Sequence, residues 1–234
     1  MAKVPTPGDD GLDDRVPFLA RLEDKERDAL LTLGREMQFA PRRELVREYE
    51  PSAHVLLVLH GWTKVTATAL NGYVALLALR GPGDIIGESA ALTGRPRSAT
   101  VTALEPVQAR AIDYSGFRTY LSEFPEAAMQ LLGLSSDRTR AADQRRLEFA
   151  SLTVRERLAV LLLELARTHG RALPEGIELA VPLSKVELAG SIGASREMVQ
   201  RLLRELRERE VVVTGRRTLI ILRPDVLRRI GAGA

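Results

Sequence analysis

Hydrophobic positions along the chain follow two spacings, one typical of helices and one typical of strands. The stretch 17–34 predicts a helix, because its apolar residues recur at helical spacing: Phe18, Leu22, Ala29, Leu30 and Leu33. From Met37 to Asp113 the pattern changes to short runs rich in Val, Leu, Thr and Ala, which are separated by turn signals. Evenly spaced short strands of this kind predict a small β-barrel.

One dipeptide within this region marks a hairpin. Asn71 and Gly72 stand between two strand-like runs, TKVTATAL and YVALLALR. Because both residues tolerate a positive φ, the pair predicts a turn of type I′ between two antiparallel strands.

Helical spacing returns in the second half of the chain. The segment from Pro125 to Phe149 predicts one long helix, although charged residues interrupt its apolar positions and make it a mediocre coiled-coil seam. A dense stripe of Leu and Ala predicts a second helix from Thr153 to His169. The region that follows contains Pro174 and Pro182 and is expected to be a loop.

The segment from Leu183 to Leu206, LSKVELAGSIGASREMVQRLLREL, has the residue pattern of a helix-turn-helix. Ala189 is small where two helices cross, and Gly193 can take the positive φ that the tight turn requires. Val199 and Leu202 are placed to face the core. An ordinary pair of amphipathic helices would explain the Leu periodicity, but not the joint placement of these four residues.

The second helix of this motif is expected to face outward with long polar side chains. Ser195 is placed to cap that helix at its first residue. The side chains on the outer face of its first two turns can reach base edges in a major groove: Arg196, Glu197, Gln200 and Arg201. The sequence therefore predicts a DNA-recognition helix.

Charge is distributed unevenly along the chain. Residues 1–140 hold 17 basic and 19 acidic side chains, whereas residues 141–234 hold 17 basic and 12 acidic ones. The basic part contains VVVTGRRTLIIL, a predicted hairpin with Arg216 and Arg217 at its tip, in the position of a wing beside the recognition helix. Phosphate neutralisation supplies most non-specific affinity for DNA, so the asymmetry favours DNA binding. A solvated arginine-rich face and an ordinary surface hairpin would have the same composition.

Composition excludes several other classes. A chain of 234 residues, 45% hydrophobic and 28% charged, fits two modest globular domains. The absence of cysteine excludes disulfides, thiolate nucleophiles and zinc fingers. No apolar run approaches the roughly 20 residues of a membrane span, and the first residues lack a signal-peptide core, so a cytoplasmic protein without membrane contact is expected. Scattered histidines and the lack of catalytic motifs argue against an enzyme, a metal site or a bound cofactor.

Together with the segment PGDIIGESAALTGRPRSATVTAL, these features resemble the cyclic AMP receptor protein and fumarate–nitrate reductase regulator (Crp/Fnr) family of bacterial transcription factors. The resemblance covers about Pro17 to Ile230. It implies an α+β fold with a cyclic-nucleotide-binding β-barrel of jelly-roll type, a long dimerisation helix and a winged helix-turn-helix. The expected divisions are a mobile tail at 1–16, the barrel at 17–122, the dimerisation helix at 123–150 and the DNA-binding domain at 151–234.

In that family the segment is a phosphate-binding cassette, and the resemblance implies these ligand-binding residues: Gly87, Glu88, Ser89, Arg97, Ser98, Ala99, Arg138 and Asp143. The guanidinium of Arg97 suits the two exocyclic oxygens of a cyclic phosphate, and Ser98 can donate to the same anion. Glu88 would accept from the ribose 2′-hydroxyl, while Gly87 lets the backbone approach closely. The alternative is that Arg97 is an exposed loop residue with Glu88 as its salt-bridge partner.

The base-reading end departs from the family pattern. Ala142 and Asp143 stand where members that respond to cyclic AMP have a threonine followed by a hydroxyl or amide residue. Ala142 cannot hydrogen-bond a base, and a carboxylate at Asp143 needs solvation or a partner such as Arg145 or Arg146. Cyclic AMP is the first expected effector; cyclic GMP, weak binding, and a regulator without small-molecule control whose barrel is a dimerisation scaffold stay open.

The recognition helix keeps more of the family pattern. Arg196, Glu197 and Arg201 match an Arg-Glu-x-x-x-Arg arrangement that reads a TGTGA-type half-site, with the arginines toward guanines and the glutamate toward a cytosine amine. The resemblance therefore implies a homodimer on near-palindromic double-stranded DNA, with RNA polymerase as a further partner.

Overall fold

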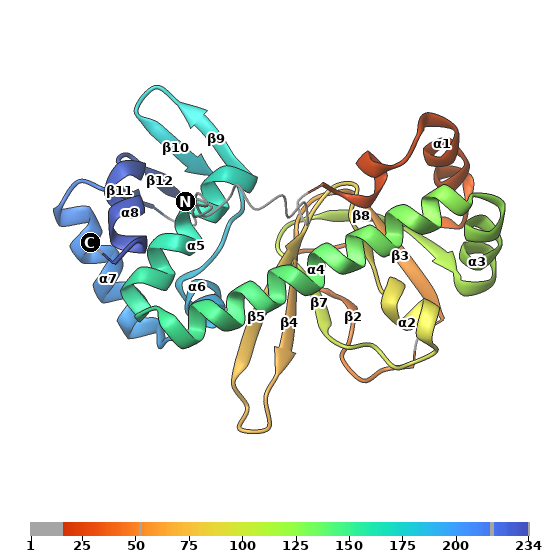
Figure 1. The fold of residues 1–234 in the computed structure, drawn as a ribbon, viewed down its shortest axis with the longest axis horizontal. Helices are drawn as coiled ribbons and strands as arrows, with labels where there is room; N and C mark the ends of the chain where they lie inside the picture. The colour runs from red at the N-terminus through yellow and green to blue at the C-terminus, as the bar shows by residue number, and fades with distance from the viewer. Residues whose placement is uncertain (1–15, 52, 216–217, 234) are drawn as a thin grey trace, which may run out of the picture. The chain divides into compact units, whose positions relative to one another are not determined.

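The computed structural model describes residues 16–51, 53–215 and 218–233. The chain forms two compact units that divide between Ala141 and Ala142, within the continuous helix α4 (Pro125–Ser151) (Figure 1). The predicted long helix is thereby confirmed, and the domain boundaries expected from the sequence stay a prediction. None of the helices among the described residues is both long enough and apolar enough to span a bilayer.

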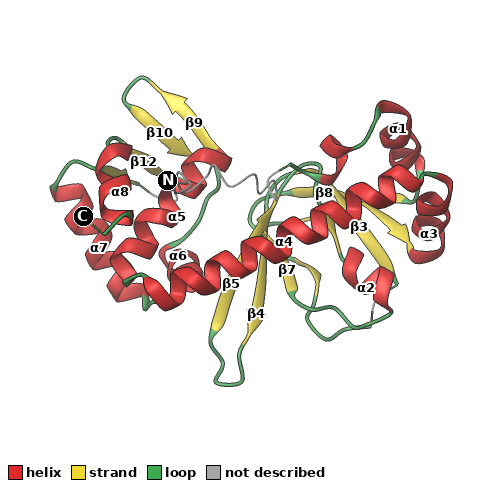
Figure 2. Ribbon diagram, in the orientation of Figure 1, coloured by secondary structure: helices red, strands yellow, loops and turns green. Residues whose placement is uncertain are grey.

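The N-terminal unit combines short strands with short helices (Figure 2). Its elements before α4 are η1 (Phe18–Arg21), α1 (Asp24–Thr32), β1 (Arg35–Phe39), β2 (Glu44–Val46), β3 (His54–His60), β4 (Thr63–Thr68), β5 (Val74–Arg80), β6 (Ile85–Ile86), α2 (Glu88–Thr93), β7 (Thr100–Ala103), β8 (Val107–Asp113) and α3 (Tyr114–Glu123).

The strands of this unit form two antiparallel sheets, in the orders β1-β8-β3-β6 and β2-β7-β4-β5. The expected fold of jelly-roll type is confirmed; among the described residues no strand pair joins the two sheets, so they face each other without closing into one continuous barrel. Apolar residues from both sheets share one core cluster, which includes Val46, Leu56, Val101 and Val107. Each sheet buries one face against the other, and this satisfies the alternating pattern without closure.

The hairpin predicted at Asn71 and Gly72 joins β4 to β5, but its turn is not of type I′. Of these two residues only Gly72 has a positive φ, +82°. The Gly72 N–H donates to the Ala69 carbonyl at 2.9 Å, and the Ala69 N–H donates to the Tyr73 carbonyl at 2.9 Å. The loop therefore has three residues, because Leu70 belongs to it, and a three-residue loop needs a left-handed residue only at its last position.

Helices cover the outer face of the first sheet. The predicted helix over 17–34 is two pieces, η1 and α1, because Glu23 begins a new helix and its N–H donates to Glu26 Oε2 at 2.9 Å. Apolar residues of these pieces pack with α3, with the start of α4 and with β3 and β8 in a second cluster, where Phe18, Leu30 and Phe117 are fully buried.

The C-terminal unit contains, after the end of α4, the elements α5 (Val154–His169), β9 (Gly170–Leu173), β10 (Gly176–Leu179), α6 (Lys185–Ile192), α7 (Arg196–Glu208), β11 (Val212–Thr214), β12 (Leu219–Ile221) and α8 (Pro224–Gly231). Its strands form one sheet, β11-β12-β10-β9. The loop expected after α5 is wrong in part, because it contains the hairpin β9–β10; Gly176 lies against the backbone of Ile221 in β12, where a side chain would not fit.

Candidate ligand pocket and nucleic-acid interface

A cavity of about 160 Å³ lies in the N-terminal unit, beside α2 and the loop that follows it. Seven of the eight residues predicted to bind a ligand line it: Gly87, Glu88, Ser89, Arg97, Ser98, Ala99 and Arg138. The eighth, Asp143, belongs to the C-terminal unit, where its carboxylate accepts from Arg146 Nη1 at 2.7 Å. Asp143 thus has one of the two partners that the sequence suggested for it.

Arg97 is buried, with 4% of its surface exposed. Its Nη2 donates to the His54 carbonyl at 2.6 Å, whereas its Nη1 is buried and has no hydrogen-bond partner among the described residues. Burial lowers the pKa of the Arg97 guanidinium. The alternative of an exposed Arg97 paired with Glu88 is therefore wrong: Arg97 is a buried cationic group that lines the cavity and has one donor atom without a partner among the described residues.

Gly87 makes room for this guanidinium. Its φ is +84°, and a Cβ placed on it would lie 1.6 Å from Arg97 Nη1. Only glycine combines this backbone conformation with this close approach. The sequence led us to expect that Gly87 lets the backbone approach a ligand closely, and this stays a prediction; in the structure the group that lies close to Gly87 is the Arg97 side chain.

Arg138 of α4 closes another side of the cavity. Its Nη1 donates to Glu88 Oε1 at 2.7 Å, and its Nη2 donates to the Ile85 carbonyl at 3.1 Å. Nη2 also lies 3.5 Å from Asp84 Oδ1. Asp84 was not singled out from the sequence; burial raises the pKa of its carboxyl, and its Oδ2 accepts from the Gly81 N–H at 2.9 Å. Arg138 consequently pairs with two carboxylates, Glu88 in the lining of the cavity and Asp84.

The helix-turn-helix forms as predicted in the C-terminal unit. Gly193 ends α6 with a φ of +63°, and the Ser195 hydroxyl accepts from the Met198 N–H at 3.1 Å at the start of α7. Val199 and Leu202 are buried, so the core-facing positions of the motif are confirmed. These local signals are enough to fix the direction in which α7 presents its outer face.

The predicted base-reading residues share the exposed face of α7. Arg196, Glu197, Gln200 and Arg201 are all exposed. Arg201 Nη2 contacts Met198 Sδ at 2.9 Å, and no ion pair among the described residues holds any of these four side chains. The strands of the predicted wing are β11 and β12; the two arginines expected at its tip, Arg216 and Arg217, lie outside the described residues.

The turn of the motif packs on the end of α4, which sequence reasoning missed. A Cβ on Gly193 would lie 2.5 Å from Phe149 Cε1, so the aromatic ring rests directly on the turn. The Arg157 guanidinium stacks 4.8 Å from the centroid of that ring. Arg157 also donates from Nε to the Ile192 carbonyl at 2.9 Å and from Nη1 to the Leu152 carbonyl at 2.7 Å. One arginine therefore binds the ends of α4 and α6 together.

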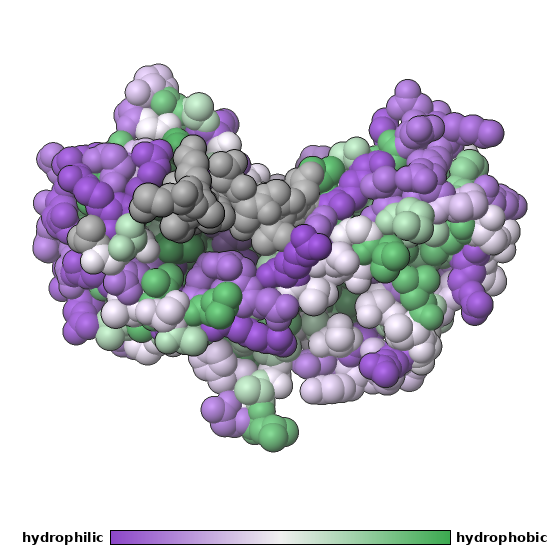
Figure 3. Space-filling view, in the orientation of Figure 1, coloured by the Kyte–Doolittle hydropathy of each residue, from purple (hydrophilic) through white to green (hydrophobic). Residues whose placement is uncertain are grey.

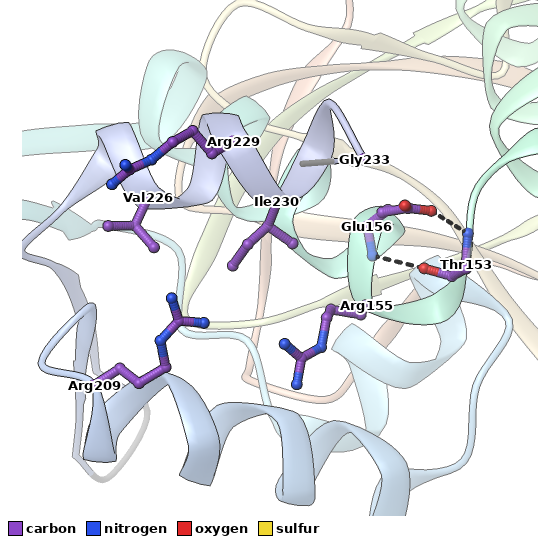
Figure 4. A pocket seen from close by; sticks show the side chains of 8 residues that line it. All are labelled: Thr153, Arg155, Glu156, Arg209, Val226, Arg229, Ile230 and Gly233. Carbon is purple, nitrogen blue, oxygen red and sulfur yellow. Dashed lines mark hydrogen bonds between the residues drawn. The ribbon is translucent and has the colours of Figure 1, made fainter.

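A second cavity, of about 450 Å³, lies in the C-terminal unit between α5, α7 and α8 (Figure 4). Three arginines line it, of which Arg155 pairs with Glu205 and Arg229 pairs with Asp225. None of the predicted site residues lines this cavity. Among the described residues no group of His, Cys, Asp and Glu is arranged to hold a metal ion.

Comparison with known proteins identifies both units. The model of the cyclic nucleotide-binding domain matches residues 36–124, and the model of the Crp-like helix-turn-helix domain matches residues 156–230. The chain is 29% identical over 220 residues to the cyclic AMP receptor protein of Thermus thermophilus, which covers 93% of this chain and 97% of that protein. It is 28% identical over 187 residues to the CRP-like cAMP-activated global transcriptional regulator of Mycobacterium tuberculosis, covering 79% and 84% of the two chains.

A solved structure with the same fold is that of FixK2 from Bradyrhizobium japonicum, with a TM-score of 0.75 at 23% identity over 86% of this chain and 99% of that one. The two matched domains stand in the same order as the two units described above, a nucleotide-binding β unit and then a helix-turn-helix. The protein belongs to the Crp/Fnr family of transcriptional regulators.

Proposed function

We propose that this protein is a homodimeric regulator that binds near-palindromic DNA under the control of a cyclic nucleotide held in the N-terminal cavity. The observation that supports an anionic effector is the buried Arg97, which lines the cavity with the rest of the cassette and whose Nη1 lacks a partner among the described residues. A phosphate oxygen would supply the missing acceptor.

The other cassette residues have complementary tasks in this proposal. Glu88 Oε1 stays with Arg138, while its second oxygen accepts from the ribose 2′-hydroxyl. Ser98 adds a donor toward the phosphate. Cyclic AMP is the first effector to test, because both curated relatives are named for it.

Titration calorimetry with cyclic AMP and cyclic GMP tests the cavity. Arg97→Glu should abolish binding, because it places a carboxylate where the phosphate would lie. Arg95→Glu makes the same charge change at an exposed position of the same loop and should leave affinity unchanged. Equal nucleotide affinity in Arg97→Glu and the unaltered protein would contradict the proposed site.

For DNA we propose that Arg196 and Arg201 read guanines and that Glu197 reads a cytosine amine in TGTGA-like half-sites. The support is their common exposed face on α7. Binding-site selection should show that Glu197→Ala relaxes one base pair, whereas Arg216→Ala, in the expected wing, weakens all sequences alike. The opposite pattern would refute the assignment. RNA polymerase is proposed as a further partner, without assigned residues.

Dimerisation through α4 is supported by its exposed apolar side chains. Met129 and Leu132 are 59% and 61% exposed, and their spacing of three places them on one helix face. Figure 3 shows further apolar surface at the tip of the β4–β5 hairpin, where Leu70 is fully exposed. Paired α4 helices would set two recognition helices about one DNA turn apart.

We propose that α4 couples the two activities, because the same helix carries Arg138, which pairs with Glu88, and Phe149, which rests on Gly193. By linkage, operator DNA should then tighten nucleotide binding by the factor by which nucleotide tightens DNA binding. Equal nucleotide affinity with and without DNA would refute the coupling. The second candidate, a family regulator without small-molecule control, is favoured by Ala142, and full DNA affinity without any nucleotide binding would support it.

A further inference from the structure

Arg80 occupies an inward-facing position at the end of β5 that strand alternation would normally fill with an apolar residue. It pairs in register with Thr63, which is fully buried, and two residues earlier Ala78 pairs with Val65. Positions two apart share a sheet face, so Arg80 lies on the same face as Val65. Both residues line the cavity of the cassette.

The wall beside Arg80 is a row of aliphatic side chains. Val46, Val101 and Val65 are cross-strand neighbours in β2, β7 and β4, and all three line the cavity. Such a row offers a flat apolar surface against which a planar base can lie. Arg80 is the charged group at this wall.

Arg80 also sets the charge of the cavity. Three arginines, at positions 80, 97 and 138, line the cavity together with Glu88, and Asp84 lies 3.5 Å from Arg138. This cluster carries a net charge of about +1 when all five groups are ionised. Asp84 accepts from the Gly81 N–H at 2.9 Å and lies 3.5 Å from Arg138 Nη2. Arg80 Nη1 donates to the Leu79 carbonyl at 2.8 Å, and a guanidinium carries five N–H donors in all.

We propose that Arg80 reads the base of the bound nucleotide and selects guanine over adenine. The inference rests on the proposed function, that the cavity holds a cyclic nucleotide by its phosphoribose. A guanidinium can only donate hydrogen bonds. Guanine offers two acceptors, O6 and N7, along one edge. Adenine has an amine in place of O6, and this amine is a donor, as the guanidinium is. Base recognition would thus come from β5, since Ala142 of α4 has no polar group for it.

Calorimetry on the full-length protein tests the proposal with four ligands: cyclic GMP, cyclic AMP, cyclic IMP and 7-deaza cyclic GMP. Cyclic GMP should bind roughly tenfold or more tightly than cyclic AMP, the discrimination typical of a bidentate arginine contact. Cyclic IMP keeps O6 and N7 and should match cyclic GMP. The 7-deaza analogue loses one acceptor and should bind several-fold more weakly.

Two variants separate the shape of the guanidinium from its charge. Arg80→Lys keeps the charge but loses the planar fork, so it should reduce the preference for guanine while cyclic AMP affinity changes little. Arg80→Leu should remove the preference, with circular dichroism melts checking that the variant folds. The analogue series on the unaltered protein stays decisive if Arg80→Leu fails to fold.

Each result decides between the two proposals. Equal or tighter binding of cyclic AMP by the unaltered protein, or an unchanged preference in Arg80→Lys and Arg80→Leu, would overturn the role of Arg80 and leave the effector site standing. Failure of the unaltered protein to bind any cyclic nucleotide would overturn both.

Discussion

The contact between Gly87 and Arg97 can be tested by adding a single methyl group. Gly87→Ala forces a left-handed backbone onto an alanine, and its Cβ would lie 1.6 Å from Arg97 Nη1, so the guanidinium must leave its place. Gly94→Ala at the other end of α2 is the matched control. Gly94 also has a positive φ, +67°, but a Cβ there would meet nothing within 4 Å.

The two substitutions should differ by the cost of moving Arg97. The left-handed backbone alone costs about 1–2 kcal/mol in an alanine, which is the full effect expected for Gly94→Ala. Gly87→Ala should add the loss of the bond from Arg97 Nη2 to the His54 carbonyl, about 1.5–3 kcal/mol for a charged donor. The expected total for Gly87→Ala is therefore about 2.5–5 kcal/mol.

Urea unfolding of a double-mutant cycle measures this difference. In an Arg97→Ala background the obstructing side chain is gone, so Gly87→Ala should cost only the backbone term and the coupling should equal about 1.5–3 kcal/mol. Cyclic nucleotide affinity should fall in Gly87→Ala and stay unchanged in Gly94→Ala. Equal effects of the two alanines, or additive effects in the cycle, would refute the reasoning.

Three further predictions concern other parts of the fold. Gly193→Ala should lower DNA affinity and thermal stability together, because its Cβ would displace the Phe149 ring from the turn; mobility shift and melting curves measure both. Leu132→Lys should shift sedimentation toward the monomer, because a charge replaces an exposed apolar residue of α4. Asp113→Ala should lower the stability of the protein, because it removes the cap of α3. Hydrogen bonds from the Gly116 N–H and the Ser115 hydroxyl lower the pKa of the Asp113 carboxyl. The stability that the unaltered protein has over the variant should therefore be full above the ordinary Asp pKa and should vanish as the pH falls through the lowered pKa. Urea midpoints at about pH 7 and about pH 2 check this sign.

The helix-turn-helix could be predicted from sequence because its determinants are local. Ser195 caps a helix through a group three residues away, and Gly193 needs its left-handed conformation within one turn. Val199 and Leu202 follow from helical periodicity alone. The packing of Phe149 on this turn could not be predicted, since it joins residues 44 positions apart and a lone aromatic in a charged segment gives no signal of its partner.

Two features of the β region, the open pairing of its sheets and the turn type at Gly72, also depend on contacts that the local sequence does not reveal. Strand patterns identify which residues are buried, but both a closed barrel and two facing sheets bury one face of every strand. Closure depends on which strands pair, and that choice is made between distant segments, as in β1 with β8 and β2 with β7. The turn at Gly72 is not the expected type I′ turn, because Ala69 pairs with Tyr73 and Leu70 therefore belongs to the loop.

Only part of the candidate ligand site can be predicted from the cassette motif. Gly87, Glu88 and Arg97 could be predicted as site residues because they lie within this one short segment. The charge of the cavity, however, is a sum over Arg80 in β5, Asp84 before β6 and Arg138 in α4 as well. Coulomb energies depend on separation, and desolvation depends on burial. Neither the charge balance of these five groups nor the lack of a partner for Arg97 Nη1 among the described residues therefore follows from their order in the chain. Arg138 and Glu88 form an ion pair, so under the proposed function a ligand that took one oxygen of Glu88 would act on α4 directly. The same ion pair would then be both part of the proposed site and the first step of its control.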